Sequence, residues 1–353
     1  MALRDEYLIA LYRDALGEPI REVEYVSLDP GGGHAYFFKP TSTDISGVAD
    51  RIGCASFPQR AGKKMLHAAA RFPPLLRLVP RVGRTRLPVG ESRQPDQILL
   101  SSRMRLVERT TSVVHTLPRG SEREVRAEID ARRDLPPALP VPTLLESDRS
   151  IPYFTERYIE GRSAGHPEDV PERYVRIYEM LLTLYEATTG PPQPTDIVVD
   201  RRLSELETSI DPVLEQARLW VDQEPLPTVL RTCDVHGDLH SANVLVTDDG
   251  PFFLDWENRR RDLALVDLIR PLLVQYYARN DMTFLKEMVS ETGNGHEYAT
   301  SYAERIGPTV YDGHEWYSAL IPLGCLCLLE EMKRGTPMWN TCYDLLENLV
   351  KER

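Results

Sequence analysis

The pattern of apolar and polar residues divides the chain into two parts. Up to residue 161, short runs alternate between apolar and polar positions, which is the two-residue period of β-strands. From residue 171 onward, apolar residues recur every three or four positions, as in amphipathic helices. The alternating runs are EVEYVSL (22–28), HAYFFKP (34–40), QILLS (97–101), MRLVER (104–109), SVVHTLP (112–118), PTLLESD (142–148) and IPYFTERYIEG (151–161).

One predicted helix interrupts the strand-like part. SEREVRAEIDARRDL (121–135) opens with Ser121 and Glu124 at the spacing of a capping box. Strands on both sides of a single helix, followed by helices to the end of the chain, predict a bilobal α+β fold. We expect a small antiparallel-sheet lobe over residues 95–161 and a larger, mainly helical lobe over residues 162–353.

Residues 1–94 are predicted to form an N-terminal extension to these two lobes. Its first 16 residues have the apolar periodicity of a helix. The runs EVEYVSL and HAYFFKP flank the turn residues DPGGG, which favours a β-hairpin. A basic helix is expected over residues 59–72, and the proline- and arginine-rich sequence after it, up to about residue 94, is typical of a linker.

Charge is distributed unevenly along the chain. The formal net charge is −12 at pH 7, which disfavours nonspecific binding to nucleic acid. Residues 57–90 nevertheless hold eight Lys or Arg and no acid, so the remainder carries −20. One face of the basic helix would suit an anionic membrane surface. A solvated face, or a contact with the acidic remainder of the chain, is the better interpretation. The basic positions on that face are Arg60, Lys63, Lys64, His67 and Arg71.

The cysteines and the apolar runs bear on the cellular location. Five scattered cysteines, an odd number, do not form the framework of a disulfide-rich secreted domain. The opening residues MALRDEYLIALYRDALGE place acids within the apolar pattern, unlike a signal peptide. The longest apolar run, ALIPLGCLCLL (319–329), is too short to span a bilayer. We therefore expect a cytoplasmic protein without a transmembrane segment, and the sequence indicates no oligomeric state.

Two neighbouring motifs carry the candidate chemistry. In HGDLHSANVL (236–245), Asp238 and Asn243 lie five residues apart on a predicted loop that runs into a strand. In FFLDWEN (252–258), a strand delivers Asp255. Phosphoryl transfer requires a group that receives or orients the proton of the acceptor hydroxyl, and oxygen ligands that hold Mg²⁺ on the nucleotide phosphates. Two acids and a neutral amide in this order suit those tasks.

These motifs resemble the catalytic and metal-binding loops of the aminoglycoside phosphotransferase and choline kinase family, which has the protein-kinase-like fold. RRRDLALVDLIRP (259–271) resembles the continuation of that family, with Asp262 and Asp267 where it carries acids that organise the helical lobe. PVPTLLESDRSIPYFTERYIEG (140–161) resembles its fourth and fifth strands and its hinge. The resemblance covers roughly residues 97–273. It implies ATP as phosphoryl donor and Mg²⁺ as the metal.

The resemblance also implies a role for each matching residue of the two motifs. Asp238 would be the catalytic base, or the acid that orients the acceptor hydroxyl. Asn243 and Asp255 would be magnesium ligands. His236 would brace the catalytic loop through hydrogen bonds without taking part in the chemistry.

The small lobe departs from the family pattern. The family carries a lysine on the third strand, where it pairs with the nucleotide phosphates and with a glutamate of the following helix. Glu128 matches the glutamate, but His115 stands at the lysine position, and the turn SSR replaces a glycine-rich loop. Three interpretations remain open. Either His115 or a nearby arginine, Arg105 or Arg119, contacts phosphate; or Lys39 reaches in from the extension; or phosphoryl transfer has been lost.

The acceptor is less well indicated than the phosphoryl donor. Acidic and aromatic residues of the helical lobe suit a cationic amine or a choline-like head group, and also suit sugar hydroxyls. Glu257, two residues after Asp255, is the strongest candidate for acceptor contact. The leading hypothesis is an ATP- and Mg²⁺-dependent small-molecule kinase that phosphorylates a hydroxyl of a sugar, an aminoglycoside or an amino alcohol such as choline. The alternative is a pseudokinase, a nucleotide-binding or scaffolding protein without phosphoryl transfer.

Overall fold

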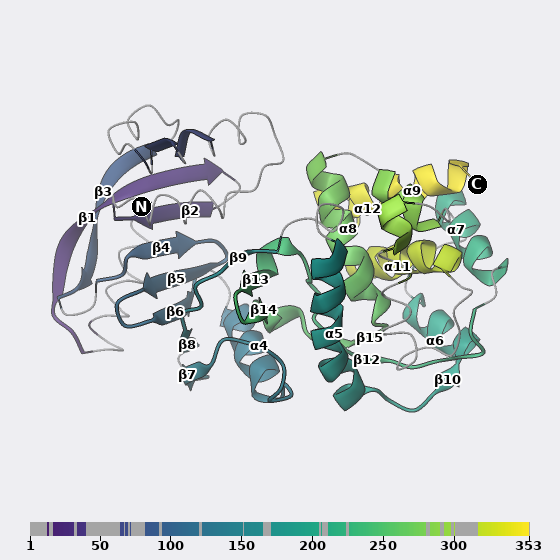
Figure 1. The fold of residues 1–353 in the computed structure, drawn as a ribbon, viewed down its shortest axis with the longest axis horizontal. Coiled ribbons are helices and arrows are strands. Elements are labelled where there is room, and N and C mark those ends of the chain that lie inside the picture. Colours follow the sequence, from purple (N-terminus) through teal and green to yellow (C-terminus); the bar gives the residue numbers. More distant parts are fainter. Residues whose placement is uncertain are drawn as a thin grey trace. The chain divides into compact units, whose positions relative to one another are not determined.

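The structure is a computed structural model of the 353-residue chain (Figure 1). It describes residues 17–31, 34–39, 64–66, 68–69, 82–91, 94–119, 122–150, 152–164, 171–204, 211–223, 226–279, 283–289, 293–297 and 317–352, together with the single residues 13, 71, 206 and 300. The helix expected over the first 16 residues and the capping residue Ser121 lie outside these residues. So do Arg60, Lys63 and His67 of the predicted basic face.

The chain folds as two compact units. The first consists of Met1–Arg133 and Val141–Ser163, and the second of Asp134–Pro140 and Ala164–Arg353. The first unit is rich in strands and the second is mainly helical, so the predicted α+β fold is confirmed. Among the described residues, no helix has the length and hydrophobicity that crossing a membrane requires.

The first unit is built on one eight-stranded sheet, in which every pair of neighbouring strands is antiparallel. The strand order is β3-β1-β2-β4-β5-β6-β8-β7 (Figure 1). The elements are β1 (Ile20–Gly31), β2 (His34–Phe38), β3 (Val82–Gly90), β4 (Gln97–Leu100), β5 (Arg103–Glu108), β6 (Val113–Pro118), α4 (Glu122–Arg133), β7 (Leu144–Asp148), β8 (Tyr153–Arg157) and β9 (Arg162–Ser163).

This sheet differs from the expected extension over residues 1–94. The hairpin β1–β2 is not separate from the lobe, because β2 pairs directly with β4 and the Tyr25 hydroxyl donates to the carbonyl of Pro95. The expected linker contains β3, in which Leu87 and Val89 are buried in the sheet core. The prolines and arginines of this segment concealed the strand. An edge strand tolerates proline, and among the described strands β3 pairs only with β1.

The described part of the basic segment packs by its apolar side. Leu66 and Ala69 are buried against Val26, Leu28 and Phe38 of the first two strands. Lys64 and Arg71 are exposed. These positions accord with the interpretation of this segment as a helix with a solvated basic face.

Different parts of the protein pack against the two faces of the sheet. Residues that alternate along each strand place Leu106, Leu117 and Tyr153 in one apolar cluster. The opposite face carries α4, whose Val125 and Ile129 pack against Phe154. A side chain on β5, β6 or β8 therefore faces either the apolar cluster or α4, according to its position in the alternation.

The second unit holds the two motifs on short strands among helices. The strand β12 pairs with β15, and β13 pairs with β14 as a hairpin. The elements are α5 (Pro171–Thr188), β10 (Gln193–Pro194), α6 (Thr195–Arg202), α7 (Pro212–Gln223), β11 (Val229–Leu230), β12 (Cys233–Val235), η5 (Ser241–Asn243), β13 (Val244–Thr247), β14 (Gly250–Phe253), η6 (Trp256–Asn258), β15 (Arg260–Asp262), α8 (Leu265–Arg279), α9 (Thr283–Val289), α11 (Tyr317–Glu331) and α12 (Pro337–Glu352).

Candidate functional site

The loop between β12 and η5 carries the first motif, and Gly237 shapes it. Gly237 adopts φ +80°, a left-handed conformation that side chains other than glycine rarely adopt. A Cβ atom at this position would lie 2.2 Å from the carbonyl oxygen of Asn258. The loop therefore passes too close to η6 for any residue other than glycine.

Asp238 follows in this loop, with its side chain 29 % exposed. Nε of Arg270, on α8, donates to Oδ1 at 3.1 Å, and Nε2 of His240 lies 3.6 Å from Oδ2. Burial favours the neutral acid, but the hydrogen bond and charge of His240, with the charge of Arg270, outweigh it and lower the pKa of Asp238. Asp238 is therefore a carboxylate at neutral pH. A carboxylate of low pKa is better suited to orient a hydroxyl than to remove its proton early.

Asn243 is held against Asp238. Its Nδ2 donates to the backbone carbonyl of Asp238 at 2.9 Å and lies 3.3 Å from the carboxylate Oδ2. Because the amide nitrogen is engaged by Asp238, the amide oxygen is the atom that Asn243 can offer to a metal ion. The side chain is buried, so its orientation is fixed by the fold.

Asp255 is brought to the same end of the β13–β14 hairpin. The backbone N–H of Leu254 donates to the carbonyl of Asn243 at 2.9 Å, which places Asp255 one residue beyond this link. Asp255 has φ 62° and ψ 65°, in the left-handed region. This conformation is costly for residues other than glycine, although Asp tolerates it better than most, and such residues cluster at functional sites.

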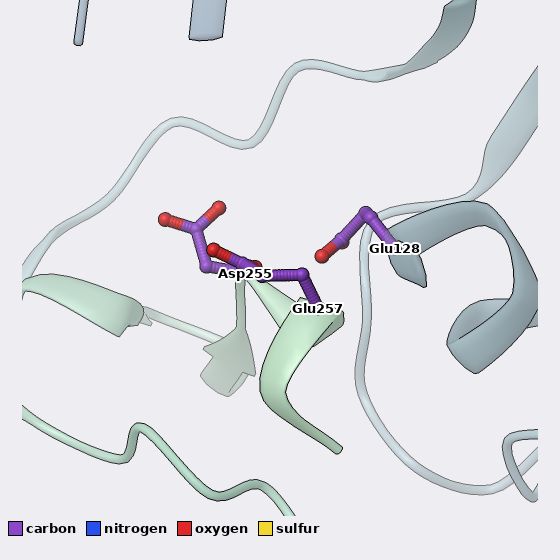
Figure 2. A group of neighbouring side chains, drawn as sticks. All are labelled: Glu128, Asp255 and Glu257. Carbon is purple, nitrogen blue, oxygen red and sulfur yellow. The ribbon is translucent and has the colours of Figure 1, made fainter. Parts of the chain in front are cut away.

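Glu257 lies beside Asp255 on η6. Figure 2 shows the two side chains at the start of this short helix, and their carboxylate oxygens approach within 4.8 Å. Figure 2 also labels Glu128, which belongs to α4 of the first unit. Asn243, Asp255 and Glu257 together offer only oxygen atoms, which is the donor set that Mg²⁺ prefers. The sequence predicts that Glu257 contacts the acceptor, and its position beside Asp255 also suits a metal-binding role.

His236 connects the two motifs. Its Nε2 lies 2.8 Å from the carbonyl of Leu254, and its Nδ1 accepts from the backbone N–H of Asp238 at 3.3 Å. Nε2 therefore carries the proton and donates to Leu254, because a carbonyl oxygen only accepts. The ring also packs against the buried Trp256, with 4.5 Å between centroids. This is the geometry that a bracing residue requires, and it leaves neither ring nitrogen for the reaction.

Asp267, on α8, holds the loop that carries Asp238. Its carboxylate is fully buried and accepts hydrogen bonds from the backbone N–H groups of His236, at 2.9 Å, and Gly237, at 3.0 Å. The Tyr185 hydroxyl donates to it as well, at 2.8 Å. Three donors satisfy the carboxylate and fix the loop that carries Asp238.

Asp262 forms an ion pair that stabilises the fold. Nε and Nη2 of Arg202 donate to its two oxygens at 2.8 and 3.0 Å, which is a bidentate pair. Burial alone would raise the pKa of Asp262, but Arg202 and Arg260 outweigh it and lower the pKa. The pair ties α6 to β15, so Asp262 stabilises the strand that pairs with β12.

In the first unit, the structure does not bring His115 and Glu128 together. His115 pairs across strands with Leu106 and Thr155 and lies on the sheet face of the apolar cluster. It is buried there, with Nε2 3.4 Å from Oε1 of Glu108 and Nδ1 3.3 Å from the Tyr153 hydroxyl. These residues line a cavity of about 280 Å³. Glu128 projects from α4 on the opposite face.

Two basic residues considered from the sequence, Lys39 and Arg119, have other contacts. Nζ of Lys39 forms an ion pair with Asp96 at 2.7 Å. Nη1 of Arg119 donates to the carbonyl of Ser101 at 2.9 Å. These contacts anchor the ends of β2 and β6 to neighbouring turns.

Two arginines that the sequence analysis did not single out lie at the key acids. Arg270 contacts Asp238, and Nη1 of Arg103 on β5 lies 3.8 Å from Oε2 of Glu128. Arg270 stands three residues after Asp267 on a helix, a spacing that places both on one side. Arg103 would have been found by starting the strand one residue earlier than Met104 and following its alternation.

Comparison with solved structures finds several similar chains. The chain is similar to a choline/ethanolamine kinase family protein from Mesorhizobium loti (15 % identity, covering 72 % of this chain and 90 % of that one, TM-score 0.42). It is also similar to choline kinase LicA from Streptococcus pneumoniae (12 %, 71 % and 90 %, TM-score 0.47). A third similar structure is a putative aminoglycoside phosphotransferase from Ralstonia eutropha JMP134 (15 %, 71 % and 89 %, TM-score 0.45).

No curated protein matches the sequence. The model of the phosphotransferase enzyme family matches residues 97–302, which is more than half of the chain and includes both motifs. The family predicted from those motifs is therefore confirmed. The chain belongs to the phosphotransferase enzyme family and is a small-molecule phosphotransferase.

Proposed function

We propose that this protein transfers the γ-phosphoryl group of ATP to a hydroxyl group of a small molecule, with Mg²⁺ bound by Asn243, Asp255 and Glu257. The acceptor oxygen forms a bond to the γ-phosphorus while the bond between that phosphorus and the β–γ bridging oxygen breaks. ADP leaves, and the hydroxyl proton passes to Asp238 or through it to solvent. The acceptor class is a sugar, an aminoglycoside or an amino alcohol such as choline.

One observation carries the proposal. Asp238, Asn243 and Asp255 converge at one end of the β13–β14 hairpin through the Asn243–Asp238 side-chain contact and the Leu254–Asn243 backbone hydrogen bond. A carboxylate that orients the nucleophile and oxygen ligands for a metal are the parts that phosphoryl transfer needs. Mg²⁺ bound there would neutralise the charge that develops on the phosphate oxygens.

The residues around Asp238 set its task. Because His240 and Arg270 keep the carboxylate ionised, Asp238 can accept a hydrogen bond from the acceptor hydroxyl over the whole neutral pH range. His236 and Asp267 hold the loop, so the carboxylate keeps its place without reorganisation during the reaction. The contribution of this chain is therefore mainly positioning and charge stabilisation.

A coupled assay of ADP release tests the proposal. Wild-type protein with MgATP would be screened against sugars, aminoglycosides and amino alcohols. Asp238→Asn should lower turnover by about 10²-fold or more. Asp249→Asn is a matched control, because Asp249 is an exposed acid in the turn between β13 and β14. Its turnover should equal that of the wild type. Acceptor-dependent ADP release that survives in Asp238→Asn would contradict the assigned role.

The pseudokinase alternative makes a different prediction. It is motivated by the absence of a lysine on the third strand and of a glycine-rich loop after QILL. In that case MgATP would raise the melting temperature of the protein, but no acceptor would stimulate ADP release. Turnover that disappears in Asp238→Asn excludes this alternative.

A further inference from the structure

The kinase-type site needs a cation in the sheet-containing lobe. In protein kinases, a lysine on the third strand contacts the nucleotide phosphates and forms an ion pair with a glutamate of the next helix. In this chain the third strand of the set β4–β8 is β6, and the following helix is α4. The β6 residues paired with the α4-facing Phe154 and Glu156 are Thr116 and Val114, neither of which is a cation.

The cation that faces Glu128 comes from the neighbouring strand. Arg103, the first residue of β5, lies with Nη1 3.8 Å from Oε2 of Glu128. The two side chains are only 4 % and 3 % exposed. Charges buried to this extent require close compensation, because desolvation strongly disfavours an isolated ion. The fold therefore holds Arg103 and Glu128 together as an ion pair.

The other nearby cation has different partners. Nη1 of Arg132, one turn after Glu128 on α4, lies 3.8 Å from Oε1 of Glu128. Its guanidinium also donates to the carboxylate of Glu156 and to the carbonyl of Pro142. Two arginines thus face two glutamates in the cluster. Arg103 and Arg132 therefore both lie 3.8 Å from Glu128, and Arg132 also pairs with Glu156.

The position of Arg103 in the sheet is one at which a side chain could contact the nucleotide phosphates. It follows the turn of Ser101 and Ser102, which connects the first two strands of the set β4–β8. The corresponding connection in protein kinases covers the nucleotide phosphates. The hydroxyl of Ser101 accepts from the backbone N–H of Arg103 at 3.3 Å, and Arg119 donates to the carbonyl of Ser101. The start of β5 is thereby held in place.

We propose that Arg103 takes the part of the missing third-strand lysine, held by Glu128 and contacting the phosphates of the bound nucleotide. This inference rests on the proposed function. Guanidinium groups bind phosphate through two parallel hydrogen bonds, so an arginine reaching in from β5 supplies the same charge with more donors than a lysine on β6. His115 is then a residue of the sheet core. Its presence at the lysine position does not imply that the protein has lost activity.

Substitutions on one strand face test the role of Arg103. Arg103→Met should raise the KM for ATP and lower kcat by about 10²-fold to 10³-fold. Arg103→Lys should recover at least a tenth of wild-type kcat, since it restores the charge. Arg105→Met is the matched control, because Arg105 is the next residue on the same face of β5, and its kinetics should stay within about threefold of wild type. Equal losses in the Arg103→Met and Arg105→Met variants would overturn the proposal.

A second variant covers the case in which Arg103→Met fails to fold. Arg103→Met/Glu128→Gln removes both charges and leaves no lone buried ion. The proposal expects this protein to melt cooperatively and to lose most of the rise in melting temperature that MgATP causes in the wild type. A double variant that keeps the wild-type rise and wild-type kcat would overturn it.

The assays also separate this inference from the proposed function. If the wild type binds MgATP but releases no ADP with any acceptor, phosphoryl transfer fails. The role of Arg103 is then decided by the MgATP-dependent melting shift of the double variant. If the wild type neither binds MgATP nor turns over, both proposals are overturned.

Discussion

Nε of Arg270 on α8 lies 3.1 Å from Oδ1 of Asp238 in the catalytic loop. This contact, together with His240, offsets the burial of the carboxylate and keeps its pKa below the ordinary value. A helix outside both motifs therefore controls the charge of the carboxylate that we propose to orient the acceptor hydroxyl. Helix α8 also carries Asp267, so the same element fixes the loop and its electrostatics.

Replacing Arg270 should change the pH profile of turnover. In the wild type the pKa of Asp238 lies below its ordinary value, so kcat/KM should not fall through protonation of Asp238 between pH 8 and pH 5. In Arg270→Met, burial is less well opposed and the pKa of Asp238 rises. The acid limb of the profile should then move to higher pH. Arg270→Lys is the control that keeps the charge. Identical acid limbs in all three proteins would show that Arg270 does not tune Asp238.

Asn243 should govern the metal requirement. Asn243→Ala removes a neutral oxygen ligand, so the Mg²⁺ concentration for half-maximal turnover should rise about tenfold or more. Asn258→Ala is a suitable control, since Asn258 is an exposed amide on η6. Titration of turnover with Mg²⁺ at saturating ATP measures the effect. An unchanged Mg²⁺ dependence in Asn243→Ala would remove Asn243 from the ligand set.

Gly237 should tolerate no side chain. Gly237→Ala combines a left-handed φ with a Cβ atom 2.2 Å from the Asn258 carbonyl, so the loop must shift. We expect a loss of stability of about 1–3 kcal/mol and a loss of most turnover, because Asp238 is the next residue. Thermal melting and ADP release measure the two effects. Gly335→Ala is the comparison, since Gly335 also has a positive φ but an open surrounding.

The ion pair of Asp262 with Arg202 should make stability depend on pH. The pKa of Asp262 is lower in the folded protein than its ordinary value of 3.8. Its stabilisation is therefore complete above about pH 5 and is lost as the pH falls through the folded-state value. Asp262→Asn should cost about 3 kcal/mol at pH 7. The difference in Tm from wild type should narrow between pH 5 and pH 3, and a constant difference would contradict the assignment.

Placing a cation on the third strand should restore part of the turnover of the Arg103→Met protein. Thr116 lies on the α4 side of β6, whereas His115 lies on the opposite side. Adding Thr116→Lys to Arg103→Met should therefore recover part of kcat, and adding His115→Lys should not. Steady-state kinetics of the two double variants decides the matter. Recovery with His115→Lys alone would mean that the face assignment of β6 is wrong.

The arrangement of the two motifs could be predicted because their residues are nearly contiguous in the sequence. Asp238, Asn243 and Asp255 lie within one stretch of sequence, and the hairpin between them follows from two short apolar strands. The contacts of Arg103 and Arg270 join elements separated by 25 and 32 positions. Finding these contacts requires knowing on which face of β5 and of α8 each arginine lies. For Arg103, the sequence pattern placed the start of the strand one residue too late.

The sheet was less predictable than the loops. The strand β3 lies in a segment rich in proline and arginine, and proline disfavours a strand unless the strand lies at an edge. The strand β1 pairs with β3 on one side and with β2 on the other, and β2 pairs in turn with β4. These pairings alone show that residues 20–38 and 82–90 belong to the lobe. Long-range pairing of this kind leaves no local signal in the sequence.

Phosphorus NMR of the reaction products is the most direct test of phosphoryl transfer. With MgATP and an active acceptor, wild-type protein should convert the γ-phosphate signal of ATP into that of a phosphate monoester, with ADP in equal amount. Asp238→Asn should leave ATP unchanged over the same time, and Asp249→Asn should behave as the wild type. If the wild type forms no phosphate monoester with any acceptor, or releases only inorganic phosphate, the protein is not a small-molecule kinase of the kind proposed.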